Sequence, residues 1–522
     1  MKLSRLLKKT AAVSLIAFFS FILISCKSPA YTVEDKNENT SEEAGKDSEI
    51  ESSLGEMDRE EAGFDVEEFL QSLPEGNIPY FKIRIELKTD SDWSTLDIEN
   101  PGNILSLKLV EKHGMVEFGD SRMDHLEITQ ELVSAEKGLE VGISVDCVLS
   151  VAALDEPVRF VLKKGDLNGS SIRIYGINID ESHLLLKEIE HDRVIPGSDG
   201  FNPVDFTLDL SGLKKSEPMT AEVSRLKKDL PKLLWAFYYS WYDQEYWKQE
   251  VFKDFPYERY NSYDVDTIKR QVDEAKQAGI DGFIFSWWGP GSTSDDNLKK
   301  VLEIAGKRDF QVSIYFETLD DFGELRDTRE IYDWLEYFIK SYRDDPDLYR
   351  IDGKLLINLW ASAVLSIESW EDIIGRLKDQ GLDAVYLEMG YNILNLDLFD
   401  GLHDYAVCEY EDLDKTFNIA SRAVRYYSIF DRYSEPKIWV ATVQPGLDTE
   451  LCYKENGFIV DRQNGDYYGS TFEAAINSDP DFIYITSWNE WPEHTYIEPG
   501  GLYGDQYLDI TSDYAKKWKG NN

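Results

Sequence analysis

Glu490 and Glu493 are the residues of this sequence best suited to acid–base chemistry. Cleavage of a glycosidic bond needs one carboxylic acid to protonate the leaving oxygen and a second carboxylate as base or nucleophile. A single turn could place both side chains at one cavity, and their proximity would separate their pKa values. Two glutamates three positions apart are more often a solvated surface, so their surroundings decide between the two interpretations.

Aromatic and acidic residues dominate the ends of several short apolar runs, including the run that precedes Glu490. A pyranose packs its C–H face on a flat aromatic ring, and most of the 30 tyrosines and 13 tryptophans need only fill cores. The composition of the run ends suits a neutral polyol better than a phosphate or carboxylate substrate. The candidate substrate-binding residues are Glu317, Trp288, Trp287, Tyr239, Tyr242, Tyr410, Asn489 and Trp491.

Other chemistries find less support. The formal net charge of −44 repels phosphate backbones and makes nucleic acid a poor partner. Ser286 and Ser487 have no nearby histidine for a nucleophilic triad, and the chain holds only six histidines. No basic or metal-binding phosphate clamp suggests a nucleotide-sugar site. We therefore predict an oligosaccharide or polysaccharide substrate, without cofactor or metal.

Eight short apolar runs alternate with amphipathic stretches from Lys232 onward. The expected strands are 233–239, 282–288, 311–317, 354–360, 384–390, 405–410, 437–443 and 482–488. One helix between them has Asp264 or Asp266 as its cap and Gly279 at its end. This alternation predicts a (β/α)₈ TIM barrel, whose active site lies at the C-terminal ends of the strands. The alternative is an open doubly wound sheet, but no glycine-rich turn follows the first strand.

The region 78–213 has a different pattern, with short strands that alternate apolar and polar residues. Clear examples are 81–87, 158–162, 172–177 and 206–210. They predict a smaller antiparallel β-sandwich domain before the barrel, joined to it by a linker at 214–231. This domain is either a carbohydrate-binding module or a platform for the barrel, which spans 232–522.

The N-terminus has the pattern of a bacterial lipoprotein signal peptide at 1–25. A basic region precedes an apolar stretch from Ala11 to Ile24, and Leu-Ile-Ser-Cys then ends at Cys26. An uncleaved membrane span is the alternative, but the apolar stretch is short for it. We predict lipidation at Cys26, an acidic disordered tether at 26–77, and a lipid-anchored location in a bacterial cell envelope, facing the periplasm or exterior.

Six motifs follow one another in an order that resembles a known family. They are Tyr-Tyr-Ser-Trp-Tyr at 238–242, Ala-Gly-Ile-Asp-Gly-Phe-Ile-Phe-Ser-Trp-Trp-Gly at 278–289, Phe316-Glu317, Gln-Pro-Gly-Leu-Asp at 444–448, the stretch 462–468, and Ser-Trp-Asn-Glu-Trp-Pro-Glu-His-Thr-Tyr-Ile-Glu-Pro at 487–499. The barrel region from about Leu234 to Leu508 resembles glycoside hydrolase family 99, the endo-α-mannosidase and endo-α-mannanase group. The last motif is the specific one.

The resemblance implies a retaining hydrolase that acts on α-mannosidic linkages. Glu490 would deprotonate the 2-hydroxyl of the sugar, whose oxygen then attacks the anomeric carbon and forms a 1,2-anhydro sugar. Glu493 would protonate the leaving oxygen and later activate water. Glu317 and Trp288 match residues that bind the sugar.

The sequence departs from the family pattern around the second glutamate. Pro492 stands where the family usually has histidine, and His494 where it has glycine. Proline fixes φ and removes an N–H, which permits a different arrangement of the loop. Two alternative functions therefore stay open: an α-glucanase that resembles family 71, or another polysaccharide hydrolase on the same barrel, and a non-catalytic glycan-binding surface lipoprotein.

Overall fold

The computed structural model describes the strands of the N-terminal region and almost all of the barrel. The described residues are 80–89, 93–99, 104–113, 116–122, 125–130, 141–150, 158–164, 170–177, 183–191, 204–208, and 227–520 without 321, 409, 411, 431–434 and 455–456. The predicted signal peptide, Cys26, the tether and most of the predicted linker lie outside these residues.

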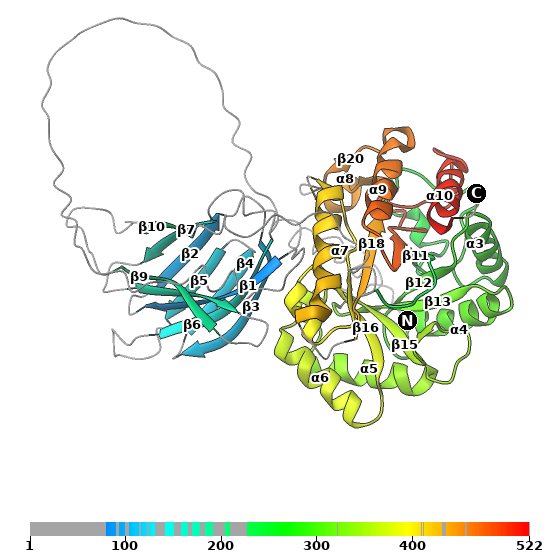
Figure 1. The fold of residues 1–522 in the computed structure, drawn as a ribbon. Coiled ribbons are helices and arrows are strands. Elements are labelled where there is room, and N and C mark those ends of the chain that lie inside the picture. Colours follow the sequence, from blue (N-terminus) through cyan, green and yellow to red (C-terminus); the bar gives the residue numbers. More distant parts are fainter. Residues whose placement is uncertain are drawn as a thin grey trace, which may run out of the picture.

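Eight parallel strands form a closed barrel (Figure 1). They are β11 (Leu233–Tyr238), β12 (Gly282–Trp287), β13 (Gln311–Glu317), β15 (Lys354–Trp360), β16 (Ala384–Met389), β17 (Gly401–His403), β18 (Ile438–Val443) and β21 (Phe482–Ile485). Each strand pairs with the next in this order, and β21 pairs with β11 to close the sheet. The predicted fold class is thereby confirmed.

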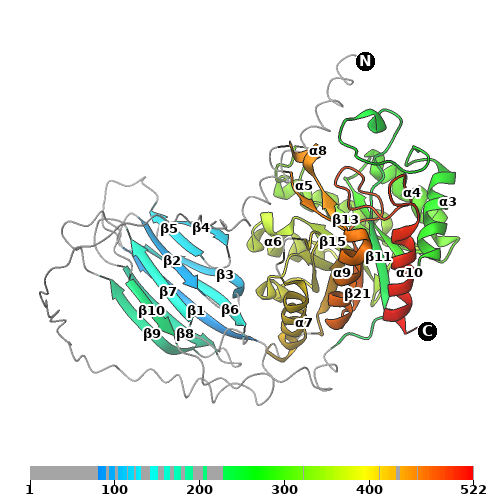
Figure 2. The ribbon, with the colours of Figure 1, turned by 90° about the horizontal axis from the view of Figure 1, so that it is seen from above.

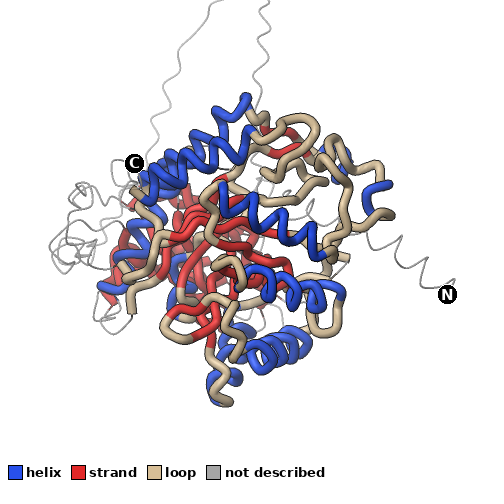
Figure 3. The backbone as a smooth tube through the Cα atoms, turned by 90° about the vertical axis from the view of Figure 1, so that its right-hand side faces the viewer, coloured by secondary structure: helices blue, strands red, loops and turns tan. Residues whose placement is uncertain are grey.

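Helices surround the barrel, as Figure 3 shows with helices in blue and strands in red. They are α3 (Val265–Gln277), α4 (Thr293–Gly306), α5 (Thr328–Tyr342), α6 (Ile367–Asp379), α7 (Leu413–Phe430), α9 (Asp466–Asn477) and α10 (Gln506–Lys519), with the short α8 (Glu450–Tyr453). The predicted helix ends hold for α3, where Asp264 is the N-cap residue and Gly279 adopts φ +82°. Glycine suits this position because it enters the left-handed region without a Cβ clash.

Short elements occupy the connections around the barrel. They are η3 (Tyr246–Lys248), β14 (Arg350–Ile351), η4 (Ser362–Val364), η5 (Ile393–Asp397), β19 (Leu447–Asp448), β20 (Ile459–Val460) and η7 (Gln463–Gly465). No helix in the described part of the chain has the length and apolar character needed to cross a membrane.

Side chains alternate between the barrel interior and the helix layer along each strand. On β11, Trp235 and Phe237 join an interior cluster, whereas Leu234 and Ala236 pack with the helices. Both faces are apolar, as is usual for a parallel sheet covered by helices. Whether a residue at the end of a strand points into the barrel or toward the helices therefore depends on its place in this alternation.

Two predicted strands end or begin elsewhere in the structure. The sixth was expected at 405–410, but β17 spans only Gly401–His403, and the described residues of the expected run lie in the loop after it. Gly401 permits this short strand, because a Cβ there would collide with the backbone of Ile438 on β18. The eighth strand ends at Ile485, before the predicted Trp488. Both corrections place more of the aromatic residues in the loops at the C-terminal mouth.

The described residues of the N-terminal region form ten strands in two five-stranded antiparallel sheets, with the orders β3-β6-β1-β8-β9 and β10-β7-β2-β5-β4 (Figure 2). They are β1 (Tyr80–Thr89), β2 (Trp93–Glu99), β3 (Ile104–His113), β4 (Val116–Arg122), β5 (His125–Gln130), β6 (Val141–Ser150), β7 (Val158–Lys164), β8 (Ser170–Ile177), β9 (His183–His191) and β10 (Val204–Leu208). Alternate residues such as Ile83, Ile85 and Leu87 form their shared core, as the sequence pattern predicts.

Candidate active site

A turn after β21 carries both candidate catalytic glutamates, and it is attached to the end of β11. The amide of Trp488 donates to the carbonyl of Phe237 over 2.8 Å. The Asn489 side chain then extends this pairing, because its Oδ1 accepts from the amide of Tyr239 and its Nδ2 donates to the carbonyl of Tyr239, each over 2.8 Å. The turn 487–494, here called the catalytic turn, is thus positioned by barrel closure.

Glu490 is 7% exposed and lies in a chain of tyrosine hydroxyls. The hydroxyl of Tyr405 donates to Oε2 of Glu490. The hydroxyl of Tyr239 in turn donates to that of Tyr405 over 2.8 Å. The backbone amide of Glu490 donates to Oγ of Ser487 over 2.8 Å. One carboxylate oxygen is therefore occupied, and Oε1 is left for another partner.

Glu493 is 5% exposed and is held by a different part of the chain. The hydroxyl of Tyr453, at the end of α8, donates to Oε1 of Glu493. The carbonyl of Glu493 accepts a hydrogen bond from the amide of Asp448 over 2.9 Å. The two glutamates thus receive hydrogen bonds from separate tyrosines.

Burial and mutual charge place the two carboxyl groups in one electrostatic environment. Burial raises the pKa of Glu490 well above its usual value, and the charge of Glu493 raises it further, against the hydrogen bond from Tyr405 and the nearby hydroxyl of Tyr239. Burial also raises the pKa of Glu493 to about 7, against the hydrogen bond from Tyr453. The pair therefore holds a proton near neutral pH, as acid–base catalysis by two carboxyls requires.

Glu317 forms a third buried carboxyl at the end of β13. Oγ of Ser286 donates to its Oε1 over 2.6 Å and accepts from the indole Nε1 of Trp288 over 2.9 Å. Burial raises the pKa of Glu317 to about 8, against the hydrogen bond from Ser286 and the charge of Arg326. Trp288 remains partly exposed. A partly exposed indole beside a hydrogen-bonding carboxyl is suited to a sugar ring.

Trp287 lies outside this group, contrary to the prediction that it binds substrate. It is fully buried, its Nε1 donates to Oδ1 of Asp295 over 3.1 Å, and its ring packs 5.1 Å from that of Phe338 on α5. Alternation along β12 turns Ser286 inward and Trp287 toward the helices. Trp287 is therefore a core residue.

Three of the other predicted residues are buried side chains that support the backbone of the catalytic turn. Tyr242, Asn489 and Trp491 are at most 1% exposed. The hydroxyl of Tyr242 donates to the carbonyl of Asn489 over 2.5 Å and accepts from the amide of Trp491 over 3.2 Å. The indole of Trp491 donates to Oε2 of Glu498 over 3.1 Å. These contacts hold the backbone of the turn.

The last two predicted residues lie on the loop side of the barrel. Tyr239 is 4% exposed and supports Tyr405, as described above. Tyr410 is half-buried, and its hydroxyl donates to Oδ2 of Asp404 over 2.5 Å. Burial raises the pKa of Asp404 to about 6.

The sequence prediction missed Tyr405 and Tyr453. Tyr405 was placed within an expected strand, although the parity of His403 and Tyr405 on an inward face could have indicated it. Tyr453 has no local signal, because its partner Glu493 is 40 positions away.

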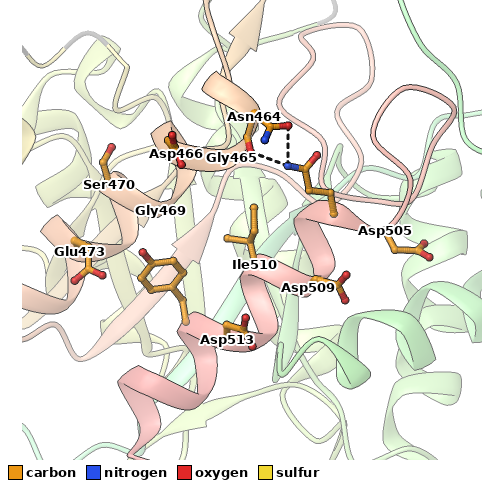
Figure 4. Close-up of a pocket in the computed structure, with 12 residues that line it drawn as sticks. Asn464, Gly465, Asp466, Gly469, Ser470, Glu473, Asp505, Asp509, Ile510 and Asp513 are labelled. Carbon is orange, nitrogen blue, oxygen red and sulfur yellow. Dashed lines mark hydrogen bonds between the residues drawn. The ribbon is translucent and has the colours of Figure 1, made fainter.

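A concave region of a different kind lies on the outside of the barrel, between α9 and α10 (Figure 4). Acidic side chains line it, namely Asp466, Glu473, Asp505, Asp509 and Asp513. Gln506 on α10 bridges it by donating to the carbonyl of Asn464 over 2.7 Å. This groove contains none of the glutamates of the catalytic turn. Among the described residues, no group of three or more His, Cys, Asp or Glu side chains is arranged to hold a metal ion.

Comparison with known proteins gives consistent matches over the barrel. Residues 254–516, half of the chain, match the family model of glycosyl hydrolase family 99. A glycoprotein endo-α-1,2-mannosidase-like protein of Mus musculus is 23% identical over 375 residues, which cover 58% of this chain and 80% of that protein. A glycoprotein endo-α-1,2-mannosidase of Rattus norvegicus is 24% identical over 388 residues, with 59% and 80% covered.

Solved structures also match the barrel region. The GH99 endo-α-mannosidase from Bacteroides thetaiotaomicron aligns with a TM-score of 0.49 and 20% identity, and the alignment covers 56% of this chain and 98% of that one.

Proposed function

The chain belongs to glycosyl hydrolase family 99, and we propose that this glycoside hydrolase cleaves α-mannosidic linkages in a mannan or glycan with retention of configuration. The observation that carries the proposal is the pairing of Glu490 and Glu493. Two buried carboxyl groups act on each other's ionisation, and each has one oxygen occupied by a tyrosine hydroxyl. The names of the mannosidase relatives support the choice of sugar.

Glu490 is the general base of the proposed first step. It takes the proton from the 2-hydroxyl of the sugar, and O2 forms a bond to C1 as the bond from C1 to the leaving oxygen breaks. Glu493 gives its proton to that oxygen. In an α-mannoside O2 and the leaving group are trans-diaxial, so that O2 approaches C1 in line. The product of this step is a 1,2-anhydro sugar and a free leaving group.

The second step reverses the role of Glu493. Its carboxylate takes a proton from water, the water oxygen attacks C1, and the C1–O2 bond opens while O2 regains a proton from Glu490. Two inversions at C1 give net retention. Over the whole cycle both carboxyls return to their starting protonation states, as a catalyst must.

Glu317 and Trp288 are the proposed contacts of the reacting sugar. The partly exposed indole ring offers a face for the C–H groups of a pyranose, and stacking of this kind contributes about 1 kcal/mol beyond area burial. Glu317 retains a proton near neutral pH, because burial raises its pKa to about 8. A protonated carboxyl can donate to a sugar oxygen as well as accept from a hydroxyl.

The purified protein should be tested against α-mannans and α-glucans, with products identified by mass and anomeric configuration. Release of α-configured products from α-mannan is expected. Inversion at the anomeric carbon would refute participation of the 2-hydroxyl. Activity on α-glucan alone would favour the α-glucanase alternative, in which O2 is equatorial and needs a ring flip before it can attack.

We also propose that Cys26 carries a lipid anchor, on the basis of the Leu-Ile-Ser-Cys sequence that precedes it. Two or more acyl chains anchor a protein stably, whereas one does not. Expression of the full chain with a clickable fatty acid should label the wild type and not the Cys26→Ser variant. Equal labelling of both proteins would refute acylation at this residue.

A further inference from the structure

The chain between β18 and α9 lies against the second half of the catalytic turn. We call the described residues 447–454 and 457–462, which contain β19, α8 and β20, the clamp segment. Its backbone and side chains contact three carbonyls of the turn and one just after it. The amide of Asp448 donates to the carbonyl of Glu493 over 2.9 Å, and Sγ of Cys452 contacts the carbonyl of Pro492 at 2.9 Å. Nη2 of Arg462 donates to the carbonyls of His494 and Tyr496 over 2.7 and 2.8 Å.

Tyr453 is the member of the clamp segment that reaches a catalytic carboxyl. Within the described part of the chain, its hydroxyl is the one side-chain donor to the Glu493 carboxylate. Burial raises the pKa of Tyr453 well above its usual value, and the charge of Glu493 adds to this effect. The phenol therefore stays protonated at neutral pH, where it can donate to Glu493.

The first half of the turn is held without the clamp segment. Glu490 receives its hydrogen bonds from Tyr405, which follows β17, and its amide contacts Ser487 of the turn itself. The base and the acid of the proposed mechanism are thus supported by separate parts of the fold. A change in the clamp segment is expected to affect Glu493 first.

The clamp segment is itself fixed to the barrel at both ends. Nζ of Lys253, in the loop after β11, lies 2.5 Å from a carboxylate oxygen of Asp448 and 3.0 Å from one of Glu450. At the other end, the guanidinium of Arg462 lies 4.8, 4.5 and 4.4 Å from the ring centroids of Tyr496, Tyr503 and Tyr507. Cation–π contacts of this kind stabilise the position of a buried arginine.

We propose that Tyr453 is a positioning residue for Glu493, which occupies Oε1 so that the acidic proton is carried on Oε2 and directed at the leaving oxygen. This inference rests on the proposed function, in which Glu493 is the general acid. The clamp segment then determines the direction of the Glu493 proton, whereas Glu490 is positioned by other residues. The turn is held here through carbonyl groups, so these contacts do not need the N–H that Pro492 lacks.

The consequence is a dependence on the leaving group. A sugar alkoxide leaves poorly and needs the proton from Glu493, whereas fluoride leaves with little assistance. We expect Tyr453→Phe to lower kcat/KM for an α-mannosyl oligosaccharide about 10- to 100-fold, within the range of general acid catalysis. For the corresponding α-mannosyl fluoride, we expect a loss of less than about threefold. The ratio kcat/KM reports the first irreversible step, so later epoxide opening does not obscure the comparison.

Two reference variants make the outcome decisive. Glu493→Gln should show the same leaving-group dependence with a larger amplitude. Tyr342→Phe removes a buried tyrosine hydroxyl that donates to Oδ1 of Asp295 over 2.7 Å in the helix layer, and it should leave both rates unchanged. In the wild type, the hydrogen bond from Tyr453 lowers the pKa of Glu493. Its loss in Tyr453→Phe raises that pKa, so the alkaline limb of the pH profile should move to higher pH.

The results separate the two hypotheses. Equal losses of Tyr453→Phe on both substrates, or no loss on either, would overturn the positioning role if Glu493→Gln still discriminates between them. Absence of discrimination by Glu493→Gln would instead refute Glu493 as the acid. If Tyr453→Phe does not fold, Lys253→Met tests the same point by loosening the clamp segment, and it should weaken oligosaccharide cleavage more than fluoride cleavage.

Discussion

The hydroxyl of Tyr405 donates a hydrogen bond to Glu490, although the two residues are 85 positions apart in the chain. Tyr405 follows β17, and Glu490 follows β21. The bond stabilises the ionised form of Glu490, which is the form that a general base requires. It also leaves the opposite carboxylate oxygen for the substrate, and this arrangement leads to the first prediction.

Tyr405→Phe should lower kcat roughly 10- to 100-fold, because Glu490 loses a hydrogen bond to its charged form and becomes a less well-oriented base. Unlike Tyr453→Phe, it should affect oligosaccharide and fluoride substrates alike, since both need O2 as nucleophile. Steady-state kinetics on the two substrates provide the measurement. Tyr468→Phe, which removes a buried hydroxyl 3.0 Å from Thr511, is the matched control. A selective effect on the oligosaccharide would contradict the base role of Glu490.

The two glutamates themselves should be needed for turnover but not for binding. Glu490→Gln and Glu493→Gln preserve the side-chain shape and one acceptor oxygen, and each should reduce kcat about 10²- to 10⁴-fold for oligosaccharides. Calorimetric titration with an uncleaved oligosaccharide should give affinities close to that of the wild type. Undiminished turnover of either variant would remove that residue from the mechanism.

Adjacent tryptophans offer a direct contrast between binding and stability. Trp288→Ala should raise KM about fivefold, because stacking is worth about 1 kcal/mol, and should change the melting temperature little. Trp287→Ala should lower the free energy of unfolding by about 3–5 kcal/mol, since it empties a fully buried core position. Kinetics and chemical denaturation of both variants test the assignment. If Trp287→Ala instead raised KM and Trp288→Ala lowered the stability, Trp287 would be the residue that faces the substrate.

Buried Glu388 should make the fold less stable as the pH rises. Burial raises its pKa from 4.5 to about 8, against a hydrogen bond from Asn395. Between these two values the folded state retains a proton that the unfolded chain has lost, so the free energy of unfolding decreases as pH increases. Glu388→Gln should reduce the difference in melting temperature between pH 5 and pH 8. An unchanged difference would show that Glu388 does not control this dependence.

The amino-acid sequence by itself determined the barrel and the identity of the main candidate residues. Strand and helix periodicities are local properties, and they located seven of the eight barrel strands to within three residues of their observed ends. The motif 487–493 likewise presents Glu490 and Glu493 in one turn, which any closed barrel would deliver to its C-terminal mouth. Such features depend only on residues that are close together in the chain.

The tertiary structure alone decided which side chains support those glutamates. The run Gly-Phe-Ile-Phe-Ser-Trp-Trp at 282–288 is apolar on both faces, so periodicity could not separate inward Ser286 from outward Trp287. Tyr405 and Tyr453 meet their glutamates only because β17, β18 and β21 lie side by side in the sheet. Contacts between residues 40 to 85 positions apart leave no mark in local composition, since each partner is compatible with many environments until the strands of the sheet pair.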